Sequence, residues 1–161
     1  MREGGCACGA VRYRLAAEPL IVHACHCRDC QRITGSAFVV NLWIERCFVE
    51  ATGESPRSFT LRAGSGQGHD LYFCGACGTT LWSRDHAPPG DTLFVRAGTL
   101  DRPDSVAPDV HIFTRTRLPW LALPEGALSF EAMYRDFDAV WPAGSLARFR
   151  RHAAEQKRAG S

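Results

Sequence analysis

Short stretches in which apolar and polar residues alternate run through most of the chain. Alternation places every second side chain on one face of an extended segment, and β-branched and aromatic residues favour strands. The pattern predicts strands over residues 10–15, 36–44, 57–62, 70–74, 92–98 and 110–114. Turn signals rich in glycine, proline or serine lie between them, at residues 64–68, 87–90 and 102–105. Few helical patterns interrupt these segments, so the sequence predicts a mainly β fold.

The pattern changes after residue 120, where two helices are predicted. Residues 129–137 are compatible with a short helix. Residues 145–160 predict a longer one, because Leu146 and Phe149 lie about one turn apart and Ser145 is suited to the N-cap position. We therefore expect a short helical appendage at the C-terminal end of a β core.

The composition is that of one globular unit. The chain has 161 residues, of which 45% are hydrophobic and 22% are charged, and these values are ordinary for a folded domain. We expect residues 1–125 to form a β domain and residues 126–161 to form a C-terminal extension. The net charge of +2 is too small to indicate a nucleic-acid partner.

The first ten residues, MREGGCACGA, contain no apolar run of the kind found in signal peptides. No stretch of the chain is apolar for long enough to cross a bilayer, so no membrane partner is expected. We therefore expect a protein of the reducing cytoplasm. Clustered cysteines in that compartment indicate a metal site or catalysis more than disulfides.

Two pairs of cysteines have the spacing of a closed zinc site. Cys6 and Cys8 form a C-x-C pair, which in extended chain places both side chains on one face. Cys74 and Cys77 form a C-x-x-C turn followed by Gly78, which brings both sulfur atoms to one point. Structural zinc takes four ligands, so the two pairs are predicted to complete one site that joins the N-terminal segment to a distant strand.

The segment CHCRDC supplies a further group, Cys25, Cys27 and Cys30. Catalytic zinc is typically held by three protein ligands, and a fourth position is left for water or substrate. Three thiolates without a fourth cysteine therefore predict an open zinc site. A histidine could still close it, since His23 would share the ligand face of an extended segment, whereas His26 would point away from that face.

Other interpretations of the cysteines are weaker on physical grounds. A C-x-C disulfide would be strained, and a reducing compartment disfavours disulfides. A redox C-x-x-C motif normally precedes a helix, but the segment GTTLW that follows Cys77 is typical of a strand. Cys47 is expected to be buried in a strand, and Trp82 and Trp120 are expected in the core. The isolated histidines are expected at the surface: His69, His86 and His152.

The residues that follow the CHCRDC segment are candidate substrate-binding groups. Arg32 could pair with a substrate carboxylate, or it could be a solvated surface charge. Thr34 and Ser36 could donate hydrogen bonds to an oxyanion, although such residues often cap turns.

Motifs with a characteristic order carry a family resemblance: GGCACGAVRY, CHCRDCQRITGSAF, FCGACGTTL and PDVHIFTRTRLPW. Over residues 3–121 the sequence resembles the glutathione-dependent formaldehyde-activating family, which also includes centromere protein V. The resemblance implies a zinc-stapled, mainly antiparallel β-tent with two zinc ions per chain. The structural ion would be bound by Cys6, Cys8, Cys74 and Cys77, and the catalytic ion by Cys25, Cys27 and Cys30. His111, within the last motif, could be a hydrogen-bonded histidine of a strand, but the resemblance favours a place in the pocket as an acid or base.

The family's named activity is a carbon–sulfur lyase reaction run toward synthesis, in which glutathione condenses with formaldehyde to S-(hydroxymethyl)glutathione. The resemblance therefore implies a zinc-dependent lyase that acts on a glutathione adduct of formaldehyde. Another small thiol or a related aldehyde is also compatible with the sequence. The alternative is a non-catalytic zinc module that binds a protein or nucleic-acid partner through its basic C-terminal residues. A purely structural module has no need of an open three-ligand site, and this favours the enzyme.

Overall fold

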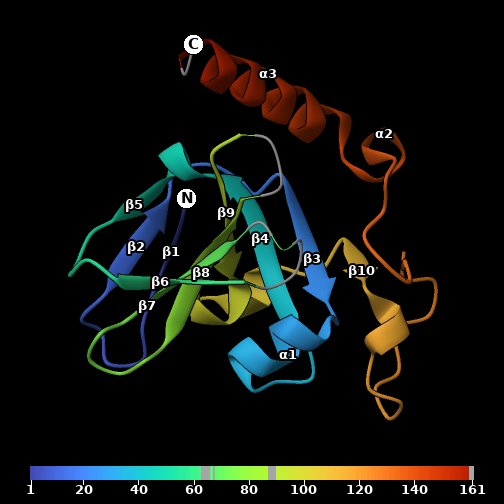
Figure 1. Cartoon of the computed structure of the whole chain (residues 1–161), viewed down its shortest axis with the longest axis horizontal. Helices are drawn as coiled ribbons and strands as arrows, with labels where there is room; N and C mark the ends of the chain where they lie inside the picture. Colours follow the sequence, from blue (N-terminus) through green and yellow to red (C-terminus); the bar gives the residue numbers. More distant parts are fainter. Residues whose placement is uncertain (63–65, 67, 87–89, 160–161) are drawn as a thin grey trace.

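The structure is a computed structural model that describes residues 1–62, 66, 68–86 and 90–159. Strands dominate it (Figure 1): β1 (Arg2–Gly5), β2 (Arg12–Leu15), β3 (Ile21–Cys25), β4 (Val39–Glu45), β5 (Val49–Ala51), β6 (Arg57–Leu61), β7 (His69–Phe73), β8 (Thr80–Asp85), β9 (Thr92–Arg96) and β10 (Val110–Ile112). The α-helices are α1 (Arg28–Thr34), α2 (Phe137–Val140) and α3 (Ala143–Ala159). Short 3-10 turns complete the chain: η1 (Arg46–Phe48), η2 (Ala97–Thr99), η3 (Pro103–Ser105) and η4 (Thr114–Thr116).

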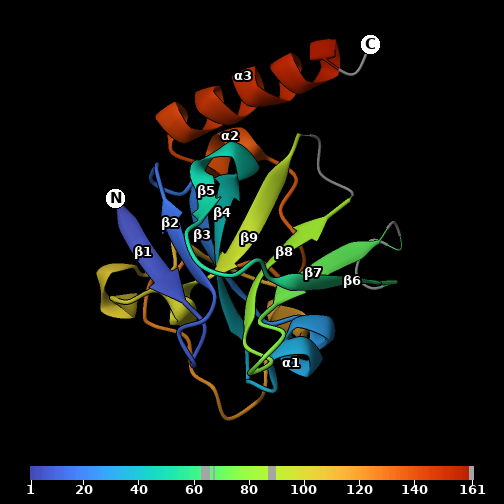
Figure 2. The same ribbon diagram turned by 90° about the vertical axis from the view of Figure 1, so that its left-hand side faces the viewer.

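The strands form two sheets. The larger sheet has the order β10-β3-β4-β9-β8-β7-β6, and the smaller one has the order β1-β2-β5. Neighbouring strands are antiparallel except for β10 and β3, which are parallel. β3 is buried along its whole length, with β4 on one side and β10 on the other, so its last residue, Cys25, has a fixed place in the fold. Figure 2 shows α3 lying across one end of the strands.

One hydrophobic core joins the two sheets. Its buried side chains come mainly from β2, β4, β8 and β9, and Tyr13 of β2 meets Trp82 of β8 edge to face at 5.6 Å between ring centroids. Cys6 and Cys74 belong to the same cluster. The two turns that carry Cys6 and Cys74 are therefore attached directly to the core that joins the sheets.

A second core joins the larger sheet to the C-terminal extension. Trp43 of β4 packs against Trp141 and Phe149, with ring centroids 5.0 and 5.8 Å away. Leu146 and Phe149 of α3 are both buried, in agreement with the predicted apolar face of this helix. Cys25 belongs to this second core. The domain boundary at residue 125 stays a prediction, but the residues after it contribute large apolar side chains to the fold.

The mainly β fold is confirmed, and every predicted strand is present with ends shifted by a few residues. The strand expected after the second cysteine pair is β8. Alternation did not reveal β1, β3 or β5. β3 reads IVHAC and is buried on both faces, so apolar and polar residues do not alternate in it, and β5 has only 3 residues.

The predicted helix at residues 129–137 is wrong. Ser129 forms a bridge with His111, and the Phe130 N–H donates to the His111 carbonyl at 2.9 Å, so this segment pairs alongside β10 instead of coiling. The C-terminal helix is confirmed, but it begins at Ala143. Ser145 therefore lies within its first turn and is not the N-cap.

Two core assignments are also wrong. Cys47 is exposed in the turn η1, and Trp120 is 72% exposed. The turn predicted at residues 102–105 coincides with η3, while the turns predicted at 64–68 and 87–90 lie mostly outside the described residues. Within the described chain, no helix combines the length and apolarity required to span a membrane.

Candidate functional site

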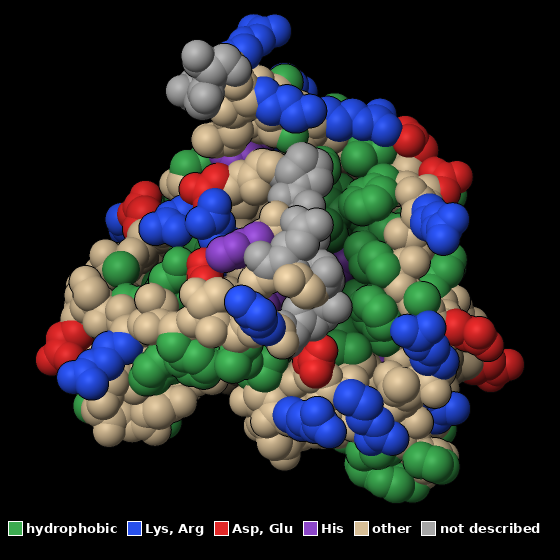
Figure 3. All heavy atoms as spheres, in the orientation of Figure 1, with side chains coloured by type: hydrophobic (Ala, Val, Ile, Leu, Met, Phe, Trp, Pro, Cys, Tyr) green, Lys and Arg blue, Asp and Glu red, His purple; other side chains and the backbone are tan. Residues whose placement is uncertain are grey.

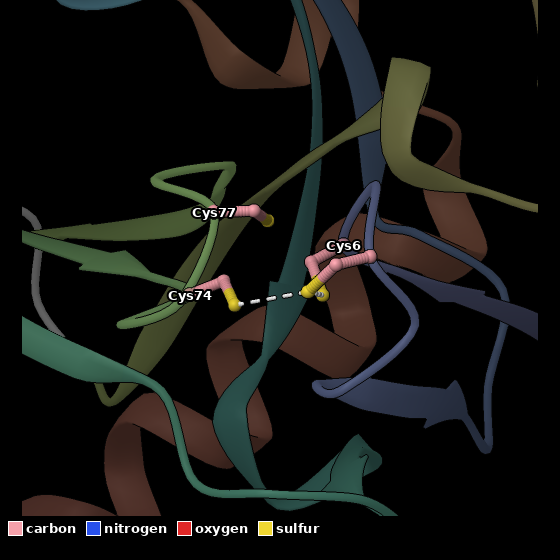
Figure 4. A group of neighbouring side chains, drawn as sticks. Cys6, Cys74 and Cys77 are labelled. Carbon is pink, nitrogen blue, oxygen red and sulfur yellow. Dashed lines mark hydrogen bonds between the residues drawn. The ribbon is translucent and has the colours of Figure 1, made fainter.

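Four cysteines converge from two tight turns. Cys6 and Cys8 lie in the turn between β1 and β2, and Cys74 and Cys77 lie in the turn between β7 and β8 (Figure 4). The first pair is thus in a turn and not in extended chain as expected. Gly78 closes the second turn with φ of 76°, a conformation that glycine adopts without strain.

The sulfur atoms of this first group are spaced for one tetrahedral metal ion. Cys6 Sγ lies 3.5 Å from Cys8 Sγ, which lies 3.7 Å from Cys74 Sγ, and all four sulfurs are within 4.8 Å of one another. Zinc–sulfur bonds of about 2.3 Å in a tetrahedron give sulfur–sulfur distances of about 3.8 Å, whereas a disulfide needs about 2.05 Å. None of these cysteines is in a disulfide in the structure, and the group could hold zinc.

Hydrogen bonds hold this group in place and favour the thiolate form that binds a metal ion. The Val11 N–H donates to Cys6 Sγ at 3.3 Å. Cys77 Sγ lies 3.2 Å from the Thr79 hydroxyl, and the hydrogen bond from Thr79 lowers the pKa of the Cys77 thiol to about 5. The Ala7 N–H donates to the same hydroxyl at 3.2 Å and so ties the two turns together.

The second group, Cys25, Cys27 and Cys30, is built at a junction of strand and helix. Cys25 ends β3, and Cys27 is the N-cap of α1, where its Sγ accepts a hydrogen bond from the Cys30 N–H at 3.3 Å. One helical turn then carries Cys30 back toward β3, and its Sγ lies 3.5 Å from that of Cys25. The three sulfurs are within 4.8 Å of one another. The spacing C-x-C-x-x-C thus brings its cysteines together, although through a helix that the sequence did not predict.

Three neighbouring thiols cannot all ionise by themselves. Hydrogen bonds from Cys25 and Cys30 lower the pKa of the Cys27 thiol. The contact with Cys27 raises the pKa of Cys25 to about 12, and the contacts with Cys25 and Cys27 raise that of Cys30. A divalent cation would relieve this repulsion, and a set of thiolates suits zinc.

Neither neighbouring histidine joins the three-cysteine group. His23 lies with its Nε2 2.8 Å from the hydroxyl of Tyr134, which also accepts a hydrogen bond from the Trp141 indole. Since that hydroxyl accepts from Trp141, its own proton is available to His23 Nε2. Burial lowers the pKa of His23 to about 4, so the ring is neutral.

His26 is fully buried and does not belong to the three-cysteine group. Its Nε2 lies 3.0 Å from Nδ1 of His111, and the rings stack at 5.3 Å between centroids. Its backbone carbonyl accepts hydrogen bonds from the side chains of Gln31 and Thr116 at 2.8 and 2.9 Å. These hydrogen bonds therefore fix the position of the loop that carries the cysteines.

The three cysteines line a cavity of about 600 Å³, a volume typical of small-molecule sites. Apolar side chains form much of the wall: Ile33, Trp43, Phe94, Ile112, Phe113 and Met133. Charged or polar groups complete it: His23, Arg28, Asp29, Asn41, His69, Ser83, Asp85, Arg96, Arg115 and Thr116. The group with three ligands therefore faces a space that could take a substrate.

Arg96 is the buried cation of this cavity. It is 6% exposed, and it donates hydrogen bonds to Asn41 Oδ1 and, at 3.0 Å, to Ser83 Oγ. Its Nε–H is buried without a partner, and none of the ion pairs found among the described residues involves it. Burial lowers the pKa of the guanidinium, and the charges of the nearby cysteines oppose this shift. Arginine stays charged in proteins, so Arg96 offsets the negative charge of the thiolates.

The other predicted site residues lie outside this cavity. His111 is buried in its pair with His26 and does not line the wall. Thr34 and Ser36 line a neighbouring hollow of about 630 Å³, with Thr34 donating to the Cys30 carbonyl at 2.8 Å, while Arg32 is exposed. Their roles in substrate binding stay predictions.

Sequence reasoning missed much of this wall, and His69 and Arg96 are the two polar residues of most chemical interest among those missed. His69 was expected at the surface but is only partly exposed at the cavity, and burial lowers its pKa. Arg96 was not singled out, although a charged residue in the apolar strand segment TLFVR is a recognisable signal.

These features define a mainly β protein with two groups of cysteines that could hold metal ions, one of them at a cavity. Residues 1–116 match the family described as "Glutathione-dependent formaldehyde-activating enzyme", and the chain belongs to this family. The resemblance inferred from the motifs is thereby confirmed.

Individual relatives are distant. A protein of Halomonas elongata named "Putative glutathione-dependent formaldehyde-activating enzyme" is 25% identical over 126 residues, which are 75% of this chain and 80% of that protein. A crystal structure of a Rhodobacter sphaeroides protein superposes with a TM-score of 0.49 at 21% identity, over 66% of this chain and 91% of that one.

Proposed function

We propose that this protein is a zinc-dependent carbon–sulfur lyase-type enzyme that joins a small thiol, such as glutathione, to formaldehyde or a related aldehyde. The observation that carries the proposal is the three-cysteine group on the wall of a cavity of about 600 Å³. Family membership and the name of the Halomonas elongata relative support the choice of glutathione and formaldehyde. Two zinc ions per chain follow from the two cysteine groups, and free thiols suit a reducing cytoplasm.

The cysteine sets differ in a way that separates structure from chemistry. Cys6, Cys8, Cys74 and Cys77 satisfy a tetrahedral ion completely, whereas Cys25, Cys27 and Cys30 leave one position for a substrate. A zinc ion bound there would lower the pKa of a thiol ligand and act as a Lewis acid.

The chain's own residues would do the remaining work. Arg96 brings a positive charge to the cavity wall, where it can stabilise oxygen as negative charge develops on a carbonyl. Apolar side chains such as Trp43 and Ile112 exclude water, which strengthens these electrostatic contacts. His23, held neutral and hydrogen bonded to Tyr134, contributes a polar edge without adding charge.

A direct test follows the formation of S-(hydroxymethyl)glutathione from glutathione and formaldehyde by NMR exchange. The zinc-loaded protein should accelerate exchange, and Cys27→Ser should reduce the acceleration by at least about tenfold. Even mutation of a residue that only hydrogen bonds to a metal ligand typically lowers activity by that factor. Cys47→Ser is the matched control, because this exposed cysteine belongs to neither group. Equal activity of Cys27→Ser and the zinc-loaded wild type would contradict the proposal.

The alternative of a non-catalytic module rests on the basic C-terminal helix. Figure 3 shows a row of Lys and Arg side chains along α3. However, Arg148 is paired with Glu45 and Arg150 with Asp138, so part of this charge is used within the chain. Because part of its positive charge is neutralised, α3 is weak support for a partner-binding role. The cavity beside the three cysteines is stronger support for an enzyme.

A further inference from the structure

Apolar side chains form much of the cavity beside the three cysteines, and the buried cation Arg96 lines it as well. Trp43 and Ile112 are buried at 2% and 5% exposure, while Phe94 and Met133 are half-buried. Arg28 and Arg115 of the wall are exposed, whereas Arg96 is buried. Polar parts of a substrate therefore fit the rim or Arg96, and the apolar part of the wall favours an apolar group.

Formaldehyde by itself would leave this apolar part of the wall unused. Its carbonyl carbon carries only hydrogen atoms, so it offers no apolar surface to Trp43, Ile112 or Met133. Burial of apolar surface is the main source of favourable binding free energy in such a pocket. An aldehyde with an aromatic or branched side chain would cover these residues while its carbonyl stays near the cysteines.

Phe113 marks the same wall by its backbone. Among the residues that the structure describes, it is the one non-glycine residue with a positive φ, at 56°. Hydrogen bonds hold Phe113 on both sides, since its N–H donates to the Ala132 carbonyl at 3.5 Å and its carbonyl accepts from the Thr116 N–H at 3.1 Å. Such strained conformations persist where the surrounding structure imposes them, and they concentrate at ligand sites.

We propose that the aldehyde substrate carries an apolar aromatic or branched-chain group, and that Phe113 is the specificity-determining residue that contacts it. This inference rests on the proposed function. In the addition, the thiol sulfur forms a bond to the carbonyl carbon, and the carbon–oxygen π pair moves to oxygen. The thiol proton ends on that oxygen. The product is a thiohemiacetal that contains every atom of both reactants, and no oxidant or reductant is consumed.

The test measures the acceleration over the uncatalysed reaction with glutathione for formaldehyde, isovaleraldehyde and benzaldehyde. The zinc-loaded wild type should accelerate the two apolar aldehydes at least about tenfold more than formaldehyde, a typical effect of small apolar groups in a fitted pocket. Phe113→Gly should lower this ratio at least about tenfold. Glycine tolerates the positive φ, so this variant should fold.

Two controls sharpen the result. Phe113→Leu retains an apolar side chain on the same strained backbone, and it should keep an intermediate ratio. Phe59→Ala removes an aromatic ring on β6 that packs against Phe73 away from the cavity, and it should keep the wild-type ratio.

Benzyl alcohol, which has an aromatic group but no carbonyl, allows binding to be measured without a reaction. By calorimetry it should bind the wild type and bind Phe113→Gly at least about tenfold more weakly. Equal acceleration of all three aldehydes, or a ratio unaffected by Phe113→Gly, would overturn the inference and leave the proposed function standing. No acceleration of any aldehyde would overturn both.

Discussion

At the scale of single residues, Arg96 links the second cysteine group to the wall of the cavity. Three thiolates and one divalent ion carry a net charge of −1, and this charge would be costly in a poorly solvated site. Arg96 supplies the opposite charge from β9, and Asn41 and Ser83 hold its guanidinium. Arg96 would therefore be a positioning and charge-balancing residue for a metal ion held by this group.

Removal of this charge should weaken the second site selectively. Arg96→Met is expected to lower the affinity of the three-cysteine group for zinc by about 10- to 100-fold, which is the usual loss when a residue that supports the metal ligands is mutated. Arg96→Lys should lose less, because it keeps the charge but not the fork of donors. Competition with a chromophoric chelator measures both. Unchanged zinc release from the second site of Arg96→Met would show that its charge is not needed there.

At the scale of elements, α3 is anchored by an ion pair that is almost buried. Arg148 donates from Nε to Glu45 Oε1 at 2.8 Å and from Nη2 to Oε2 at 3.1 Å, and the Glu45 side chain is 1% exposed. Arg150, on the same helix, pairs with Asp138 at 2.7 Å, but both side chains are more than half exposed. The two pairs therefore form a matched comparison of buried and solvated charge.

Loss of Arg148 should destabilise the fold far more than loss of Arg150. Arg148→Met leaves the Glu45 carboxylate buried without its cation and should lower the free energy of unfolding by about 3 kcal/mol. Arg150→Met should lower it by less than about 1 kcal/mol. Urea denaturation followed by tryptophan fluorescence measures both values. Similar losses for the two variants would mean that the Glu45 pair is no stronger than a surface pair.

The elements differ in how far local sequence determines them. A strand with one more exposed face, such as β2, shows alternation and was predicted, whereas β3 is buried on both faces and was not. The helix α1 was missed because it has only 7 residues and none of them is buried, so no apolar face shows in its sequence. Residues 129–137 have helical composition, but pairing with β10 overrides it.

The candidate site was predictable where its chemistry is local. Cysteine spacing identified both groups that could hold metal ions, because turns and short helices bring near neighbours together. The cavity wall depends on contacts between distant segments, since the pairing of β10 with β3 places Ile112 beside Cys25. Met133 reaches the wall from the C-terminal extension, and nothing in its surrounding sequence indicates this.

At the scale of the whole molecule, the two cysteine groups serve different parts of the fold. The first group joins the β1–β2 turn to the β7–β8 turn, so it connects the smaller sheet to the larger one. Two of its members, Cys6 and Cys74, are buried in the core between those sheets. The second group is formed within a single strand–helix junction, which also receives hydrogen bonds to the His26 carbonyl.

Loss of one ligand should therefore have opposite consequences in the two groups. Cys74→Ser should unfold or strongly destabilise the protein, because a metal ion that joins distant segments contributes directly to the free energy of folding. Cys27→Ser should stay folded while bound zinc falls from two ions per chain to one. Elemental analysis combined with thermal melting measures both effects, with Cys47→Ser as the control for loss of a cysteine. If Cys27→Ser unfolds as fully as Cys74→Ser, the second group is also structural, and the open position it was assigned does not exist.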